Sequence, residues 1–126
     1  MARRRGTESS CSCWRRLTDA RAGLAFLRAL PEVDSRHVAV AGHSFGGSLT
    51  LLLAERDSSL MAAVDYAGAA RSWEVSPQLR ARLLKAVGAT TAPIFFIHAT
   101  NDYSVAPGKA LTAEMDRLGK PPNHAS

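Results

Sequence analysis

The pentapeptide Gly42-His43-Ser44-Phe45-Gly46 restricts the fold of this 126-residue chain more than any other segment. It fits the pattern G-x-S-x-G and lies between a short apolar run, His37–Ala41, and a segment with helical spacing, Gly46–Ala54. On such a strand-to-helix turn the serine hydroxyl is exposed at the carboxyl edge of a sheet, and small flanking residues relieve crowding. Five-residue patterns of this kind also occur by chance in glycine-rich turns that only join a strand to a helix.

The rest of the chain alternates between segments with strand and helix patterns. Short apolar runs predict further strands at Met61–Tyr66 and Pro93–His98, and helical spacing predicts helices at Asp19–Leu30, Pro77–Val87 and Pro107–Leu118. This order predicts an α/β fold in three αβα layers, with a parallel sheet of three to four strands and helices on both faces. In the loop Ala67–Ser76, Trp73 is either a pocket wall or a packed side chain.

A carboxylate follows the third predicted strand. The loop Ala99–Pro107 carries Asp102 to the carboxyl edge of the sheet, where active sites of open α/β sheets form. A carboxylate there can accept the Nδ1–H of a histidine and stabilise the imidazolium that forms when the histidine takes a serine proton. The order Ser44 then Asp102 is also the order of α/β-hydrolases. We therefore predict Ser44 as nucleophile, Asp102 as acid and the Phe45 N–H as an oxyanion donor.

The segments Gly42–Gly47 and Phe96–Pro107 resemble the dienelactone hydrolase and prolyl-oligopeptidase-like branch of the α/β-hydrolases. The resemblance covers residues 18–122 and implies that the chain is part of an α/β-hydrolase domain. It implies cleavage of esters, lactones or short peptides, with no metal and no organic cofactor. Dienelactone hydrolase itself uses a cysteine nucleophile, so Ser44 argues against that particular substrate.

None of the four histidines is a convincing base. His37 opens the first strand at the opposite edge of the sheet, and His43 adjoins the serine but points away from it. His98 ends the third strand as a core or cleft-wall residue. His124 follows Asp102 in the chain, but the preceding helix returns it to the amino edge of the sheet, a strand length of ~17–20 Å away from Ser44. The resemblance implies a further strand near this point, with the base in the loop beyond it.

The basic charge is concentrated at the start of the chain. Residues 1–16 hold five arginines against Glu8, a net +4 out of the chain's +5. We predict a disordered basic leader, 1–16, before a partial hydrolase domain, 17–126, and no nucleic-acid partner. Cys11 and Cys13 can complete neither a disulfide framework nor a zinc site. No apolar run is long enough for a membrane span or follows a signal-peptide pattern, which predicts a cytoplasmic protein without a membrane partner.

Two functional hypotheses follow. The first is a serine hydrolase that forms an acyl-enzyme, truncated at both ends and lacking its catalytic histidine, so that this chain alone has little turnover. The second is a non-catalytic α/β scaffold or interaction module that retains the serine turn. Exposed parallel edges of a partial sheet also predict self-association with another chain.

Overall fold

A computed structural model describes residues 8–120 and 122–125 and places the side chains of residues 15–120. The chain divides into two compact units, Met1–Ser35 and Arg36–Ser126. Among the described residues, no helix is both long enough and apolar enough to span a membrane.

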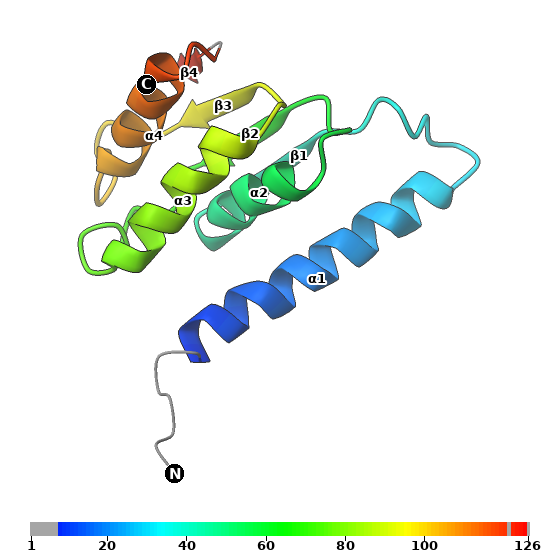
Figure 1. Ribbon diagram of the computed structural model, residues 1–126, viewed down its shortest axis with the longest axis horizontal. Coiled ribbons are helices and arrows are strands. Elements are labelled where there is room, and N and C mark those ends of the chain that lie inside the picture. Colours follow the sequence, from blue (N-terminus) through cyan, green and yellow to red (C-terminus); the bar gives the residue numbers. More distant parts are fainter. Residues whose placement is uncertain (1–7, 121, 126) are drawn as a thin grey trace. The chain divides into compact units, whose positions relative to one another are not determined.

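The first unit contains helix α1 (Glu8–Ala29) (Figure 1). We predicted a helix from Asp19, and this start is wrong because no proline or glycine interrupts residues 8–22. Helix α1 thus includes residues 8–16 of the predicted leader, and residues 1–7 lie outside the described part. The boundary between a leader, 1–16, and a domain, 17–126, stays a prediction.

The second unit is a parallel sheet with helical crossovers. Its elements are β1 (Val40–His43), α2 (Phe45–Arg56), β2 (Ala63–Tyr66), α3 (Pro77–Ala89), β3 (Ile94–Ile97), α4 (Ala106–Arg117) and β4 (Pro122–Ala125). The strands are ordered β1-β2-β3-β4, and each pairs in parallel with the next. The predicted α/β class with a parallel sheet, as part of a three-layer hydrolase fold, is confirmed.

Helices α2, α3 and α4 lie side by side over one face of the sheet (Figure 1). The strand order never reverses, so every right-handed crossover falls on the same face. The core between sheet and helices is formed by fully or nearly fully buried side chains, among them Leu51, Leu53, Leu83, Val87, Ile94, Phe96, Leu111 and Met115. This layer fixes the positions of the loops at the carboxyl edge.

The predicted elements are correct in order and type, but several of their ends are not. We predicted the first strand at His37–Ala41, whereas the ladder extends to His43 because Gly42 and His43 pair with Asp65 and Tyr66. Helix α2 likewise begins at Phe45, directly after Ser44. The strand that the family resemblance implies after the last helix is present as β4.

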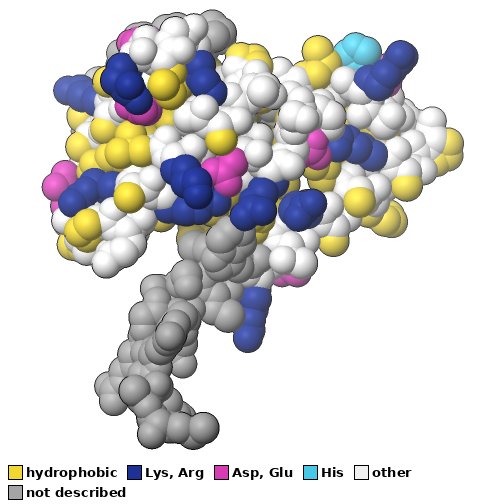
Figure 2. Space-filling model, viewed as in Figure 1, with side chains coloured by type: hydrophobic (Ala, Val, Ile, Leu, Met, Phe, Trp, Pro, Cys, Tyr) yellow, Lys and Arg dark blue, Asp and Glu magenta, His cyan; other side chains and the backbone are white. Residues whose placement is uncertain are grey.

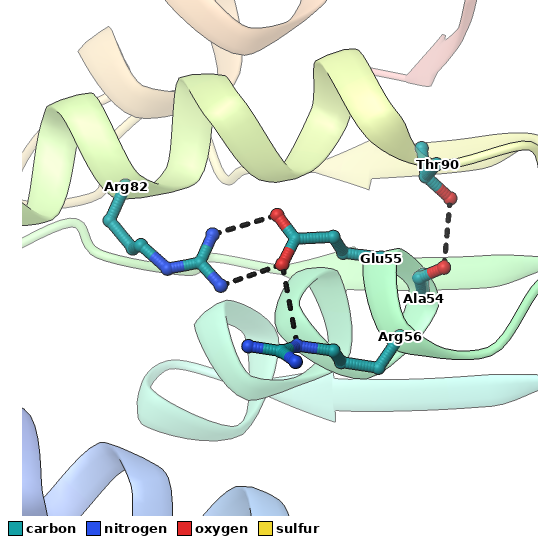
Figure 3. A network of polar contacts seen from close by, with 5 residues as sticks. All are labelled: Ala54, Glu55, Arg56, Arg82 and Thr90. Carbon is teal, nitrogen blue, oxygen red and sulfur yellow. Dashed lines mark hydrogen bonds and ion pairs between the residues drawn. The ribbon is translucent and has the colours of Figure 1, made fainter.

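An ion pair joins α2 to α3. Both terminal nitrogens of Arg82 donate to the Glu55 carboxylate, at 2.7 and 2.6 Å, and Arg56 Nε lies 3.6 Å from the same group (Figure 3). These bonds hold the pKa of Glu55 below its usual range. Acidic side chains also lie beside several basic ones on the face seen in Figure 2. The Glu55–Arg82 pair differs from exposed pairs because the Glu55 side chain is only 11% exposed.

We expect Glu55→Gln to lower the free energy of unfolding by about 1 kcal/mol at neutral pH, since the pair is bidentate and partly buried. Because the folded-state pKa of Glu55 is lowered, its contribution is present above pH 4.5 and is lost as the pH falls through the folded value. Urea denaturation of both proteins at neutral and acidic pH measures this difference. The control is Glu114→Gln, which removes the exposed pair with Arg117 and should cost less. Equal losses for the two variants would contradict the prediction.

Candidate active site

Ser44 occupies a tight turn between β1 and α2. Its φ of 58° and ψ of −115° are rare for a residue with a side chain and cost of order 1–3 kcal/mol. The Ser44 N–H donates to the Tyr66 carbonyl at 2.8 Å, and the Ser44 carbonyl accepts from Gly47 and Ser48 at 3.0 and 3.2 Å. Strand β2 and the first turn of α2 therefore hold the backbone of this residue, while the residue itself is exposed.

The glycines of this turn are under unequal constraint. A Cβ at Gly42 would lie 2.0 Å from the Gly46 carbonyl oxygen, and one at Gly47 would lie 2.3 Å from Asp65 Oδ1. A Cβ at Gly46 would have no atom within 4 Å. The sequence argument that small residues on both sides of the serine relieve crowding is thus correct for Gly42. On the other side, Gly47 rather than Gly46 is the crowded position.

Asp102 lies in the loop between β3 and α4. Strand β3 is separated in the sheet by β2 from β1, the strand that leads to Ser44. Its N–H donates to the Ala99 carbonyl at 3.0 Å, and its Oδ1 accepts from the Tyr103 N–H at 2.7 Å. Its Oδ2 is buried and has no hydrogen-bond partner. The side chain is 22% exposed, so one oxygen is fixed by the loop and the carboxylate remains partly accessible.

His98 lies beside Asp102. Its Nδ1 is 3.6 Å from Asp102 Oδ2, and its side chain is only 7% exposed. A Cβ at Gly108 of α4 would lie 2.6 Å from His98 Cδ2 and 3.0 Å from Nε2, so the far edge of the ring is covered by α4. The prediction that His98 is a core or cleft-wall residue agrees with this burial. Both ring nitrogens are buried, which argues against His98 as a base that reaches a proton on Ser44 or on a substrate.

Asp65 was not identified from the sequence, where it is a single acid in an otherwise apolar strand. It is fully buried on β2, and its Oδ1 accepts the Gly68 N–H at 2.8 Å. Burial raises its pKa from 3.8 to about 6, against the lowering effects of the Gly68 N–H and of the charge of His98. The loop that it holds is strained, because Ala67 and Ala69 adopt φ values of 54° and 61°.

The other three histidines lie before β1, at the end of β1 and in β4. His43 is exposed, with its ring 6.1 Å from that of Tyr66, and His37 precedes β1 at the amino edge. His124 pairs with Phe96 within the body of the sheet, and its side chain lies outside the described part.

Two interpretations of Trp73 were open, a pocket wall or a packed side chain. Packing is favoured because the side chain is only 6% exposed. The described residues contain no group of three or more His, Cys, Asp or Glu that could hold a metal ion.

A parallel sheet with a G-x-S-x-G turn after one strand and an acid loop after another defines the α/β-hydrolase class. The model of the dienelactone hydrolase family matches residues 7–120, so this chain belongs to that family. No protein with a curated description matches the chain.

Two solved structures illustrate the similarity. The Pyrococcus horikoshii acylaminoacyl peptidase has a TM-score of 0.72 and 19% identity, over 86% of this chain and 22% of the peptidase. The dienelactone hydrolase-like promiscuous phosphotriesterase P91, from metagenomic libraries, has a TM-score of 0.67 and 27% identity, over 97% of this chain and 48% of P91. The chain therefore spans between about a fifth and a half of these proteins.

Proposed function

We propose that this chain carries the nucleophile and the acid of a serine hydrolase that works through an acyl-enzyme. The observation that supports this most directly is the backbone of Ser44, because a serine held at positive φ between a strand and a helix has a cost that a plain connecting turn avoids. Under this proposal Ser44 Oγ attacks a substrate carbonyl carbon, and the leaving group departs when the tetrahedral intermediate collapses.

The oxyanion is stabilised at the start of α2. As the first residue of that helix, Phe45 has an N–H without an acceptor in the helix, and the positive end of the helix dipole lies at the same place. The Phe45 N–H is therefore our candidate for one donor to the oxyanion, a type of contact worth about 3 kcal/mol of transition-state stabilisation.

Asp102 orients the histidine that accepts the serine proton. None of the three histidines with described side chains suits the role of base: His98 is buried against α4, His43 neighbours the serine along the strand, and His37 precedes β1. We infer that the base lies outside these three. Free imidazole can then replace it in part, because a small base needs only hydrogen-bond reach of Ser44 Oγ.

We propose esters, lactones or short peptides as the substrate class, and the family and the two similar structures support this. Esters, lactones and short peptides all present a carbonyl carbon for the same attack, and one of the similar proteins is a peptidase. The other is described as a phosphotriesterase, which suggests a phosphorus electrophile as a probe of Ser44.

The test is fluorophosphonate labelling of the whole purified chain, followed by intact mass, with and without imidazole. Ser44 Oγ attacks phosphorus, fluoride leaves, and the proton passes to imidazole, so we expect imidazole to accelerate the addition of one label per chain. Ser44→Ala should abolish the label. Ser72→Ala, which removes an exposed hydroxyl from the loop after β2, should label like the unchanged chain.

Labelling that is rapid without imidazole would also support Ser44 as nucleophile and would assign the base to this chain. A folded chain that takes up no label under either condition would exclude the proposed role of Ser44. That result would favour the alternative, a non-catalytic scaffold.

A further inference from the structure

Four buried polar atoms from three residues at the carboxyl edge have no hydrogen-bond partner: Asp65 Oδ2, His98 Nδ1, His98 Nε2 and Asp102 Oδ2. An unpaired buried polar group costs about 1–3 kcal/mol, so these four atoms require an explanation. Two are carboxylate oxygens, which only accept hydrogen bonds, and two are ring nitrogens, which can both donate in an imidazolium. Acceptors and donors are thus matched in number.

His98 and Asp65 lie on the same face of the sheet. Asp65 pairs with Phe96 in the ladder between β2 and β3, and His98 is two residues beyond Phe96, so all three side chains point to the side of α2, α3 and α4. The charge of His98 also lowers the pKa of Asp65, although burial outweighs this effect. Asp65 itself is anchored by the Gly68 N–H.

The other side of the ring faces the acid loop. His98 Nδ1 is 3.6 Å from Asp102 Oδ2, a few tenths of an ångström longer than a hydrogen bond. Gly108 lies against the opposite edge of the ring, where any Cβ would collide with it. The ring therefore lies between the acid loop and α4, and it has little freedom to turn away from Asp102.

We propose that His98 is a positioning residue for Asp102, and that it donates to the inner carboxylate oxygen while Asp65 holds the ring from β2. This inference rests on the proposed function only in naming Asp102 as the triad acid. With Oδ1 bound by the Tyr103 N–H and Oδ2 bound by His98, the carboxylate has one orientation. A phenyl ring or an aliphatic side chain would fill the same space and leave Asp102 Oδ2 unpaired.

Two variants separate hydrogen bonding from space filling. In His98→Asn the amide nitrogen is bonded to Cγ, as Nδ1 is, so it can still donate to Asp102. In His98→Gln the amide nitrogen is one atom further out, at the place of Nε2, so the donor to Asp102 is lost. Both variants are neutral and polar, and both remove the positive charge that Asp65 experiences.

The measurement is nuclear magnetic resonance of the whole chain. The Tyr103 amide, which donates to Asp102 Oδ1, reports whether the carboxylate is held. We expect its shift to be retained in His98→Asn and to move toward the value of an unstructured chain in His98→Gln. Identical Tyr103 shifts in the two variants would overturn the inference.

A second route to the same readout leaves His98 in place. Gly108→Ala should push the ring and shift the Tyr103 amide as His98→Gln does, since its Cβ would lie 2.6 Å from Cδ2. Gly88→Ala is the matched helical control, because its Cβ would meet only Leu118 Cδ1, at 3.6 Å. If Gly108→Ala leaves the Tyr103 amide unchanged, the ring does not position Asp102.

The failure of this inference and the failure of the proposed function give different results. If imidazole-dependent labelling of Ser44 is seen but the Tyr103 amide has the same shift in His98→Asn and His98→Gln, the hydrolase proposal stands and the positioning role fails. If no labelling is seen while the Tyr103 amide still distinguishes the two variants, His98 holds Asp102 and the proposed role of Ser44 fails.

Discussion

Gly42→Ala is expected to lower the free energy of unfolding of the second unit by about 3 kcal/mol or more, the upper end of the usual cost of overpacking. The new Cβ would lie 2.0 Å from the Gly46 carbonyl oxygen, 2.3 Å from its carbon and 2.6 Å from Thr50 Oγ1. Two of these atoms belong to the backbone at the start of α2, which cannot move without displacing the Ser44 turn (Gly42–Gly46). Relaxation of a side chain therefore cannot relieve the clash.

The matched control is Gly46→Ala, in the same five-residue turn. Its Cβ would have no atom within 4 Å, and Gly46 lies inside a helix, where alanine is favoured over glycine by up to about 1 kcal/mol. We expect Gly46→Ala to be neutral or slightly stabilising. Urea denaturation followed by far-ultraviolet circular dichroism compares the two. Variants of equal stability would mean that the turn does not have the conformation described for Ser44.

The fold could be predicted from the sequence because local pattern and global order agree. Short apolar runs such as Pro93–His98 cannot be helices of useful length, and alternation with helical segments leaves a parallel sheet as the simple solution. The ends of the elements could not be predicted in the same way. β1 extends to His43 only because Tyr66 on the neighbouring strand supplies a partner, and that pairing is not a local property.

The neighbourhood of Asp102 was only partly predictable. Its place at the carboxyl edge follows from the strand before it, so Asp102 could be named from the sequence. Where the side chains of His98 and Asp65 lie relative to Asp102 depends on strand register and on the face of the sheet that each side chain occupies. A single acid in the strand Ala63–Tyr66 was the available signal, since a charged residue is seldom fully buried without a partner.

Asp65→Asn is expected to stabilise the chain at neutral pH by up to about 3 kcal/mol, by the linkage between pKa and folding. The pKa of Asp65 is raised from 3.8 to about 6, mainly by burial. Between these values the folded chain binds more protons than the unfolded chain, so stability falls as the pH rises from 3.8 to about 6. Above about pH 6 the buried carboxyl is ionised in the folded chain and lowers the free energy of unfolding by the full amount. Below pH 3.8 it is protonated in both states and has no such effect.

Denaturation of Asp65→Asn and of the unchanged chain across this window tests the sign. The stability gain of the variant should grow as the pH rises and should disappear near pH 3.8. Asp116→Asn on the exposed side of α4 is the control, and should leave the pH dependence unchanged. A gain that is constant with pH, or a loss at neutral pH, would show that Asp65 is not a destabilising buried charge.

The direction of this effect bears on the role of the site. Asparagine keeps an acceptor for the Gly68 N–H, so the loop Ala67–Ala70 does not by itself require a carboxylate at residue 65. A buried carboxylate that its own loop does not require calls for another role, and His98 lies on the same face of the sheet, two residues beyond the Phe96 that pairs with Asp65. We therefore expect Asp65→Asn to gain stability and, at the same pH, to shift the Tyr103 amide that reports on Asp102. If the variant is stabilised but the Tyr103 amide does not shift, the buried charge of Asp65 takes no part in positioning Asp102.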